Sequence, residues 1–196
     1  MVVIVIFMLE DQRDLLVDLV NTLHRPDDDD LLADPRATSW LRQRAPAKDK
    51  ASAAGAYPGG STDGQQLRML RDLREGLREL AGANNGREPD EQILDQARQA
   101  LEASPFTMTL QPGTLRPLAA TPGNAAQVFA EAAAAYLAVA VTSSWKRVKT
   151  CANPGCQWAY VDASRNGSRR WCDMASCGNA AKQRAFRRRQ PTAGEA

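Results

Sequence analysis

Residues 151–189 read CANPGCQWAYVDASRNGSRRWCDMASCGNAAKQRAFRRR and carry the clearest structural signal of the chain. This stretch contains all four cysteines of the 196-residue chain, in the spacing Cys-x4-Cys-x15-Cys-x4-Cys. Two close pairs separated by a longer loop are typical of two thiolate knuckles that fold around one tetrahedral metal ion. Zinc suits four sulfur ligands because it is borderline-soft and does no redox chemistry. We therefore expect one structural zinc ion, and its ligands are Cys151, Cys156, Cys172 and Cys177.

Two other interpretations of the four cysteines are a pair of disulfide bonds and an iron–sulfur cluster. Residues 1–9 have no basic segment, and Glu10 and Asp11 follow them in place of a cleavage site, so we expect no secretory signal. No apolar run approaches the roughly 18 residues of a membrane helix. We therefore expect a cytoplasmic protein with no membrane partner. Zinc is favoured over disulfides in such a reducing compartment.

The net charge of +2 conceals an uneven distribution of charge along the chain. Residues 1–144 carry 14 basic and 20 acidic side chains, whereas residues 145–190 carry 11 basic side chains and only two acids. With 43% hydrophobic and 24% charged residues, the composition excludes a fully disordered chain. The contrast predicts a larger acidic module and a smaller basic one, and a basic surface favours a polyanion as its partner.

The pattern outside the cysteine segment is mainly helical. Leucines recur at helical spacing over Leu67–Leu80 with arginines on the other faces, which predicts a strongly amphipathic helix. Short alternating stretches on either side of Gln111-Pro112-Gly113 predict a β-hairpin near residues 105–119. The other expected elements are helices at Asp11–His24, from Asp34 through Leu41, at Glu88–Ala103 and from Thr121 towards Trp145, and a loop at Pro46–Thr62.

The expected fold class is therefore mainly α with a small β-hairpin (α+β). A helical N-terminal domain covers residues 1–144, a compact zinc module covers residues 145–190, and residues 191–196 form a disordered tail. Because neither Gly nor Pro interrupts residues 125–150, we expect a stiff helical connection between two physically distinct modules. The helical domain has its own leucine-rich core, so we expect it to keep its fold when the metal is removed.

Local signals describe the zinc module further. Asn153-Pro154-Gly155 predicts a tight turn in the first knuckle, and Asn166-Gly167 predicts a hairpin turn. A short strand is expected within Gln157–Val161. Asn179 is a candidate cap for a helix over Ala180–Arg189. That helix combines a small apolar face with an arginine face, which suits a reader of a nucleic-acid groove.

Contacts with DNA bases are expected from the face of this helix that points away from Ala181 and Ala185, because arginine and glutamine suit bidentate contacts with guanine and adenine. The candidates for base edges are Gln183, Arg184 and Arg187. The candidates for phosphate contacts, which position a protein without reading sequence, are Arg169, Arg170, Lys182, Arg188 and Arg189. One finger offers an interface of only about 600–1,000 Å². Useful specificity then needs two copies, so we expect a homodimer formed through the helical domain.

The cysteine segment resembles the CGNR-type zinc finger, which is named for a Cys-Gly-Asn-Arg stretch at its second knuckle. The matching features are the Cys-x4-Cys pair, the Ser-Arg segment that follows an aromatic residue and an aspartate, the Arg-Arg-Trp-Cys-x-Met stretch and the last Cys-Gly-Asn. One position departs from the pattern, because Ala180 stands where the name implies arginine. If that arginine contacts DNA, this chain binds more weakly or reads another sequence, and Arg184, one turn later, offers a partial substitute.

The N-terminal part resembles the ABATE domain that usually precedes this finger. The similarity lies in Val17–Leu23, in the pair Trp40-Leu41 and in the leucine–arginine repeats. Proteins of this kind are described as stress-induced bacterial transcription regulators. The resemblance therefore implies a zinc-containing, DNA-binding regulator that has double-stranded DNA as its partner and is associated with the nucleoid.

Several polar residues of the N-terminal part have two interpretations each. Asp18 and Asn21 interrupt an apolar helix pattern, and they are candidates either for a ligand-binding pocket or for internal hydrogen bonds to a loop or an arginine. His24, the only histidine, is expected at a helix end, and the alternative for it is a ligand or catalytic role. Asp27–Asp30 lack the spacing of a calcium-binding loop and are expected in solvent. The arginines of Arg68–Arg78 are expected on an exposed or salt-bridged face.

The chain contains no P-loop, dinucleotide-binding glycine pattern, nucleophile elbow or HExxH motif, so we expect that it is not an enzyme. Two alternatives to a DNA-binding regulator remain. The first is a zinc-stapled adaptor whose basic helix binds RNA or an acidic protein partner. The second is a small enzyme or ligand-binding domain at the N-terminus, which would need a polar pocket around Asp18 and Asn21.

Overall fold

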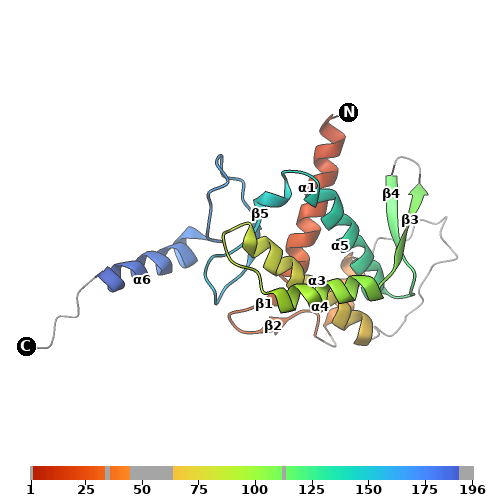
Figure 1. Cartoon of the computed structure of the whole chain (residues 1–196), viewed down its shortest axis with the longest axis horizontal. Helices are drawn as coiled ribbons and strands as arrows, with labels where there is room; N and C mark the ends of the chain where they lie inside the picture. The colour runs from red at the N-terminus through yellow and green to blue at the C-terminus, as the bar shows by residue number, and fades with distance from the viewer. Residues whose placement is uncertain (1, 34–35, 45–63, 112–113, 190–196) are drawn as a thin grey trace, which may run out of the picture.

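The computed structural model describes residues 2–33, 36–44, 64–111 and 114–189. The expected loop at Pro46–Thr62, the expected tail at 191–196 and the expected helix start at Asp34-Pro35 lie outside the described residues. The helices of the body are α1 (Val2–Val20), α2 (Ala37–Arg44), α3 (Gly64–Ala83), α4 (Glu91–Ala103) and α5 (Asn124–Ala140) (Figure 1). With three small antiparallel strand pairs among the described residues, the structure confirms the expected fold class.

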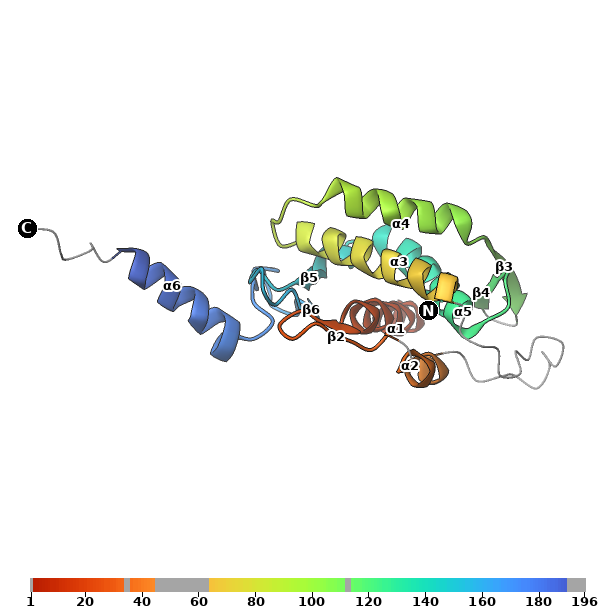
Figure 2. The ribbon, with the colours of Figure 1, turned by 90° about the horizontal axis from the view of Figure 1, so that it is seen from below.

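The core of the body lies where α1, α3 and α5 meet, and Figure 2 shows α4 lying along α3. The leucine repeat of α3 faces this core, and each of its members is at most 4% exposed: Leu67, Leu70, Leu73 and Leu77. The close contact between α3 and α4 requires Gly76, because a Cβ atom there would stand 2.4 Å from the Cβ of Ala97. Across the part of the chain that the structure describes, no helix has the length and apolar character needed to cross a membrane.

The expected hairpin is formed by β3 (Phe106–Gln111) and β4 (Thr114–Ala119), which pair antiparallel. It packs against α5, where Gln127 fixes the position of β4. The side-chain oxygen of Gln127 accepts from the Ala119 backbone N–H at 3.2 Å, and its amide nitrogen donates to the Pro117 carbonyl at 2.9 Å. A buried helix side chain thus satisfies backbone groups of the strand and holds the hairpin beside α5.

The end of the first helix differs from the expectation. α1 ends at Val20, and the chain then turns, because the hydroxyl of Thr22 donates to the Leu19 carbonyl at 2.7 Å. His24 therefore does not lie at the helix end but in β1 (Leu23–His24), which pairs with β2 (Asp29–Asp30). Strands of two residues carry too little pattern for a prediction from sequence.

The connection to the zinc module also differs. α5 ends at Ala140, where the hydroxyl of Thr142 donates to the Val139 carbonyl at 2.8 Å. The chain continues through a turn and the short 3-10 helix η1 (Trp145–Arg147) into β5 (Val148–Thr150). The expected continuous helix towards Trp145 is therefore wrong, and a stiff connection between the modules stays a prediction. The contacts that join the two modules are described below.

Two acidic residues of the body lie among buried arginines. The expectation that Asp27–Asp30 lie in solvent is wrong for Asp30, which accepts hydrogen bonds of 2.7 and 3.2 Å from Arg74, and Arg74 is only 3% exposed. Glu75 forms ion pairs with both Arg74 and Arg78. Burial alone would raise the pKa of both carboxyls, but the neighbouring guanidinium groups outweigh it and lower the pKa of Asp30 and of Glu75.

These lowered pKa values predict how the stability of the body depends on pH. A carboxyl whose pKa is lower in the folded state contributes stability that is fully present above its ordinary pKa of about 4. That stability is lost as the pH falls through the folded pKa. We therefore expect the free energy of unfolding to decrease as the pH falls from 5 to 3, and urea unfolding at several pH values measures it.

Acid also affects the cysteine ligands, so the control compares pH slopes rather than stabilities. Asp30→Asn should be less stable than the parent at pH 7 and should show a smaller loss between pH 5 and pH 3. Identical pH slopes for Asp30→Asn and the parent would contradict the assignment of this dependence to the Asp30–Arg74 pair.

Candidate metal centre and basic helix

The four cysteines gather at one point of the zinc module. Their sulfur atoms all lie within 4.8 Å of one another, and the sulfurs of Cys156 and Cys172 are 3.7 Å apart. Thiolates that surround a zinc ion tetrahedrally at about 2.3 Å stand about 3.8 Å from each other. All four cysteines are free, and a 3.7 Å separation is far longer than the roughly 2.05 Å of a disulfide bond. The donor set and its geometry therefore fit one structural zinc ion.

The first knuckle is the turn that the sequence predicts. The Cys156 N–H donates to the Asn153 carbonyl at 2.9 Å, which closes the turn over Pro154 and Gly155. The next residue, Gln157, has a φ of 49°, an uncommon conformation for a residue with a side chain. The side-chain amide of Asn153 also points at the Cys177 sulfur, at 3.7 Å, and so connects the two knuckles.

The second knuckle is a helical turn, η2 (Met174–Gly178), that runs directly into α6 (Asn179–Arg189). Its cap is Asp173, whose carboxylate accepts from the Ser176 N–H at 2.8 Å and from the Ser176 hydroxyl at 2.7 Å. The prediction that Asn179 caps the helix is therefore wrong: Asn179 lies inside the helical run and donates to the Ala175 carbonyl. Since Cys177 lies within this run, a metal ligand is part of the same rigid element as α6.

The surroundings of the thiols determine which of them carry a proton that zinc binding must displace. Burial raises the pKa of Cys156 to about 11 and raises that of Cys172 further. For Cys177, burial also raises the pKa, but hydrogen bonds from Asn153 and the neighbouring cysteines outweigh it and lower the pKa. Zinc binds thiolates, so loading the site releases protons from Cys156 and Cys172 at neutral pH.

A buried ion pair holds the loop between the two knuckles. The ammonium group of Lys149 lies 2.7 Å from the carboxylate of Asp162, and the two residues are 5% and 1% exposed. Asp162 also accepts from the N–H groups of Ser164 and Arg169, while Lys149 donates to the carbonyl of Gly167. Gly167 has a φ of 61°, as the expected turn requires, although no strands flank it. These hydrogen bonds satisfy the two buried charged groups and hold the loop in place.

This pair predicts a large effect of one substitution. Asp162→Ala leaves the Lys149 ammonium buried without a counter-charge, which costs about 3–5 kcal/mol of unfolding free energy. The double variant Lys149→Met, Asp162→Ala should recover part of that loss because it removes the unpaired charge. Urea unfolding of the zinc-loaded protein measures both. Asp173→Ala, which removes an exposed cap, is the matched control and should lose only about 1 kcal/mol; equal losses for Asp162→Ala and Asp173→Ala would contradict the argument.

The basic helix α6 stands away from the body in both ribbon views (Figures 1 and 2). None of its residues is buried, and six of the predicted DNA contacts are exposed along it: Lys182, Gln183, Arg184, Arg187, Arg188 and Arg189. Ala180, at the position that departs from the CGNR pattern, is partly buried at its base. Phe186 is 62% exposed among these charges.

The two remaining predicted contacts, Arg169 and Arg170, lie at the zinc centre and not on α6. Arg169 donates to the carbonyls of Trp171 and Cys172, and its guanidinium lies 4.6 Å from the centre of the Tyr160 ring. Its side chain therefore builds the module. Arg170 is exposed, with its guanidinium 5.9 Å from the centre of the Trp171 ring, and it remains accessible to a partner.

Three asparagines attach the zinc module to the helical domain. Asn21 pairs with the backbone of Ala159 in β6 (Ala159–Val161), donating to its carbonyl at 3.0 Å and accepting from its N–H at 2.7 Å. Asn84 donates to the carbonyls of Trp145 and Val148, and Asn85 donates to that of Thr150. Side-chain amides thus take the place of a neighbouring strand on both sides of the β5–β6 pair.

Asp18 and Asn21 make internal contacts of the kind that the second interpretation described. Asp18 forms an ion pair with Arg44, and Asn21 is held by Ala159. Neither residue lines the two cavities described below. A ligand-binding role for the two residues stays a prediction.

Arg78 was not identified as a functional residue from sequence. It is fully buried on α3 and donates to the carbonyls of Val20, Leu23 and Gln157, the last of which directly follows the zinc ligand Cys156. Burial lowers its pKa to about 10, with the Glu75 carboxylate acting in the opposite direction, so the guanidinium stays charged at neutral pH. One signal was available, since Arg78 follows Leu67 by eleven residues, about three helical turns, and so lies on the leucine face.

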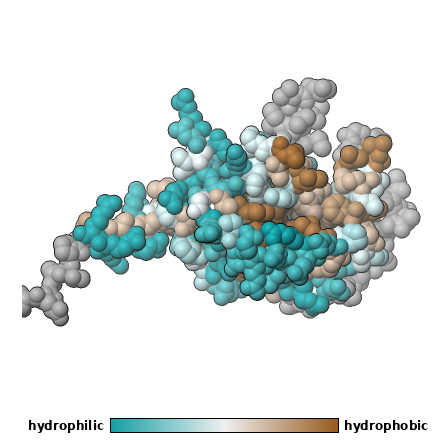
Figure 3. All heavy atoms as spheres, viewed as in Figure 1, coloured by the Kyte–Doolittle hydropathy of each residue, from teal (hydrophilic) through white to brown (hydrophobic). Residues whose placement is uncertain are grey.

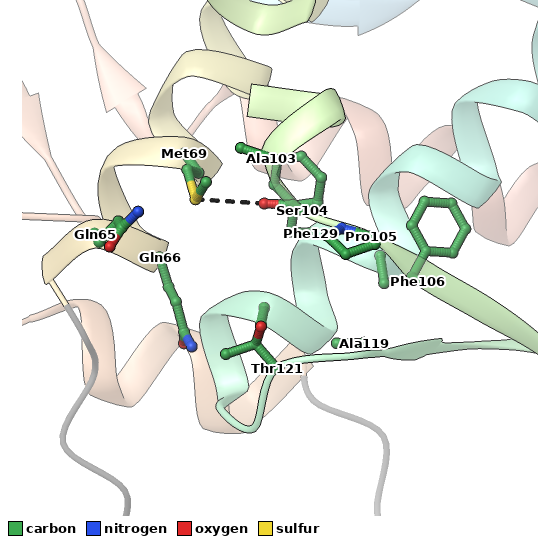
Figure 4. A pocket seen from close by; sticks show the side chains of 12 residues that line it. Gln65, Gln66, Met69, Ala103, Ser104, Pro105, Phe106, Ala119, Thr121 and Phe129 are labelled. Atoms are coloured by element: carbon green, nitrogen blue, oxygen red, sulfur yellow. Dashed lines mark hydrogen bonds between the residues drawn. The ribbon is translucent and has the colours of Figure 1, made fainter. Parts of the chain in front are cut away.

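Among the described residues of the helical domain, two cavities bear on function. The smaller, of about 120 Å³, lies between α3, the end of α4 and the start of α5 (Figure 4). Two of its polar side chains are already in use, because Ser104 donates to the Met69 sulfur and Gln66 donates to the Pro122 carbonyl. The larger is an apolar groove of about 1,000 Å³ between α1, α5 and the hairpin.

A mostly helical domain that carries a four-cysteine zinc centre with an exposed basic helix defines this chain as a zinc-finger protein. Comparison with known families agrees: residues 147–190 match the CGNR zinc finger, and residues 13–143 match ABATE, the family described as "putative stress-induced transcription regulator". The chain belongs to the ABATE family. A search of curated proteins found no match.

Proposed function

We propose that this protein is a DNA-binding transcription regulator whose zinc module presents α6 to duplex DNA. The helical domain sets the orientation of that helix and joins two copies into a homodimer. The regulator acts in the cytoplasm, in association with the nucleoid, and it is not an enzyme. Membership of a transcription-regulator family supports the regulatory role.

The observation that carries the proposal is the exposed, rigidly based α6. An α-helix fits the major groove of DNA, and a helix with no buried residue is free to enter it. The residues proposed for base edges are Gln183, Arg184 and Arg187. The residues proposed for phosphates are Arg170, Lys182, Arg188 and Arg189. Arg169 is better described as a residue that positions the others, because its guanidinium contacts carbonyls of the second knuckle.

Selection of bound duplexes from a random pool, followed by binding measurements at two salt concentrations, tests the proposal. Arg187→Ala should lose about 1–3 kcal/mol of discrimination at one base position. Arg170→Ala should weaken binding to all duplexes alike and reduce the salt slope by about one unit. The matched control is Arg98→Ala, because Arg98 is an exposed arginine on α4, far along the chain from the zinc module. If both variants lost the same affinity for duplexes of every sequence, α6 would act only as an electrostatic patch.

A second candidate, an adaptor for RNA or an acidic protein, is favoured by Phe186. This ring is 62% exposed on α6, beside the small face of Ala181 and Ala185, and such a patch suits a partner with an apolar surface. Preference for single strands or RNA in the binding measurements would support this candidate. The third alternative, an enzyme or ligand-binding site at Asp18 and Asn21, has less support because both side chains already have internal partners.

A further inference from the structure

The proposed function leaves unexplained an apolar groove at the end of the body opposite α6. Its walls are α1, α5 and the β3–β4 hairpin, and its volume is about 1,000 Å³. Leu15, Ala135 and Pro117 contribute one lining residue from each wall. Figure 3 shows hydrophobic surface on two prominences at this end, over the end of α5 and over the hairpin.

The rim of the groove is strongly exposed. Leu137 and Val141 of α5 are 66% and 77% exposed, and Leu110 and Met108 of the hairpin are 80% and 49% exposed. Exposed apolar side chains that gather around a groove mark an interaction site more often than scattered ones do. Exposed apolar side chains on both sides of a wide groove are well placed to interdigitate with the surface of a partner protein.

The same chain also offers an apolar segment next to the groove. Asp11, Gln12 and Leu15 of α1 line it, and α1 continues beyond them to Val2. The sequence of that continuation, Val2–Leu9, consists only of apolar residues. An all-apolar sequence in a helix that borders an apolar groove gives the chain two apolar features that could cover each other across a two-fold axis.

We propose that this groove, together with the adjoining part of α1, is the interface with a second copy of this chain. Joining two copies here leaves both α6 helices uncovered, since α6 lies at the other end of the molecule (Figures 1 and 2). It also keeps the two basic modules apart, which limits their mutual repulsion. The proposal deepens the dimer named under the proposed function, but its test needs no DNA.

Sedimentation equilibrium of the full zinc-loaded chain tests the interface. We expect a dimer, and we expect Leu137→Glu to raise its dissociation constant at least about a hundredfold, because each substitution occurs twice and buries an unpaired carboxylate. Leu110→Glu, on the hairpin, should have the same effect without altering a helix. The matched control is Leu101→Glu on α4, where the leucine is 40% exposed but lies outside the groove; it should stay dimeric. Circular dichroism confirms that each variant is folded.

A parent chain that stays monomeric at about 0.1 mM would overturn the proposal and assign the groove to a small molecule or to another protein. A dimer that survives both Leu137→Glu and Leu110→Glu would place the interface elsewhere and would also overturn it. A groove-dependent dimer that fails to bind duplex DNA would instead overturn only the proposed function. The two failures are therefore distinguishable.

Discussion

Removal of zinc is expected to unfold the zinc module and to destabilise the helical domain as well. Metal binding in small zinc modules contributes on the order of 10 kcal/mol to folding. The β5–β6 pair is bonded to Asn21, Asn84 and Asn85, and Ala159 belongs to the hydrophobic core of the body. Once the module unfolds, those amides and that part of the core lose their partners. The contacts in the structure therefore lead to a different prediction from the sequence alone, which predicts that the helical domain keeps its fold when zinc is removed.

Chelation of the full chain, followed by urea unfolding with circular dichroism, measures the effect. We expect the helical signal to persist in part without denaturant and its unfolding midpoint to fall. Adding zinc back should restore the midpoint, and Cys172→Ser should behave as the chelated protein does. An unchanged midpoint for the helical transition after chelation would mean that the two modules are energetically independent.

Arg78→Met is expected to cost about 3–5 kcal/mol of unfolding free energy and to weaken zinc binding as well. The substitution leaves the carbonyls of Val20, Leu23 and Gln157 without their donor in a buried place. It also removes one of the positive charges around Glu75. Because Gln157 directly follows Cys156, the affinity for zinc should fall together with the stability.

Urea unfolding and a competition assay with a zinc chelator measure the two effects. Arg68→Met, on the exposed side of the same helix, is the control and should change stability by no more than about 0.5 kcal/mol. Arg78→Lys keeps the charge but lacks the planar fork that reaches several carbonyls, so it should recover only part of the loss. Full recovery by Arg78→Lys would show that charge alone matters at this position.

The parts of this structure that sequence predicts are those with a local cause. The spacing of Cys151, Cys156, Cys172 and Cys177 predicts their convergence because short knuckles leave the chain few ways to bring four sulfurs together. The leucine spacing of α3 predicts its buried face because residues three and four positions apart lie on the same side of a helix. The assignment of base and phosphate contacts to the arginines of α6 stays a prediction.

The parts that sequence does not predict have long-range causes. β5 has three residues, and its partners come from β6 and from the asparagines after α3, so no window of local sequence contains them. The burial of Arg74 and Arg78 depends on carboxylates and carbonyls contributed by distant segments. Without knowledge of those partners, the charge of an arginine predicts a position on the surface.

The amide contacts between the asparagines and the β5–β6 pair have a consequence for how such proteins can exchange parts. The two family matches meet between residues 143 and 147, so a recombination event there would transfer a zinc finger as one piece of sequence. That piece would leave behind Asn21, Asn84, Asn85 and Arg78, which bond to its backbone carbonyls. A zinc finger inherited without these four side chains would lose its fixed orientation relative to the helical domain. We therefore expect the finger and the helical domain to be inherited together.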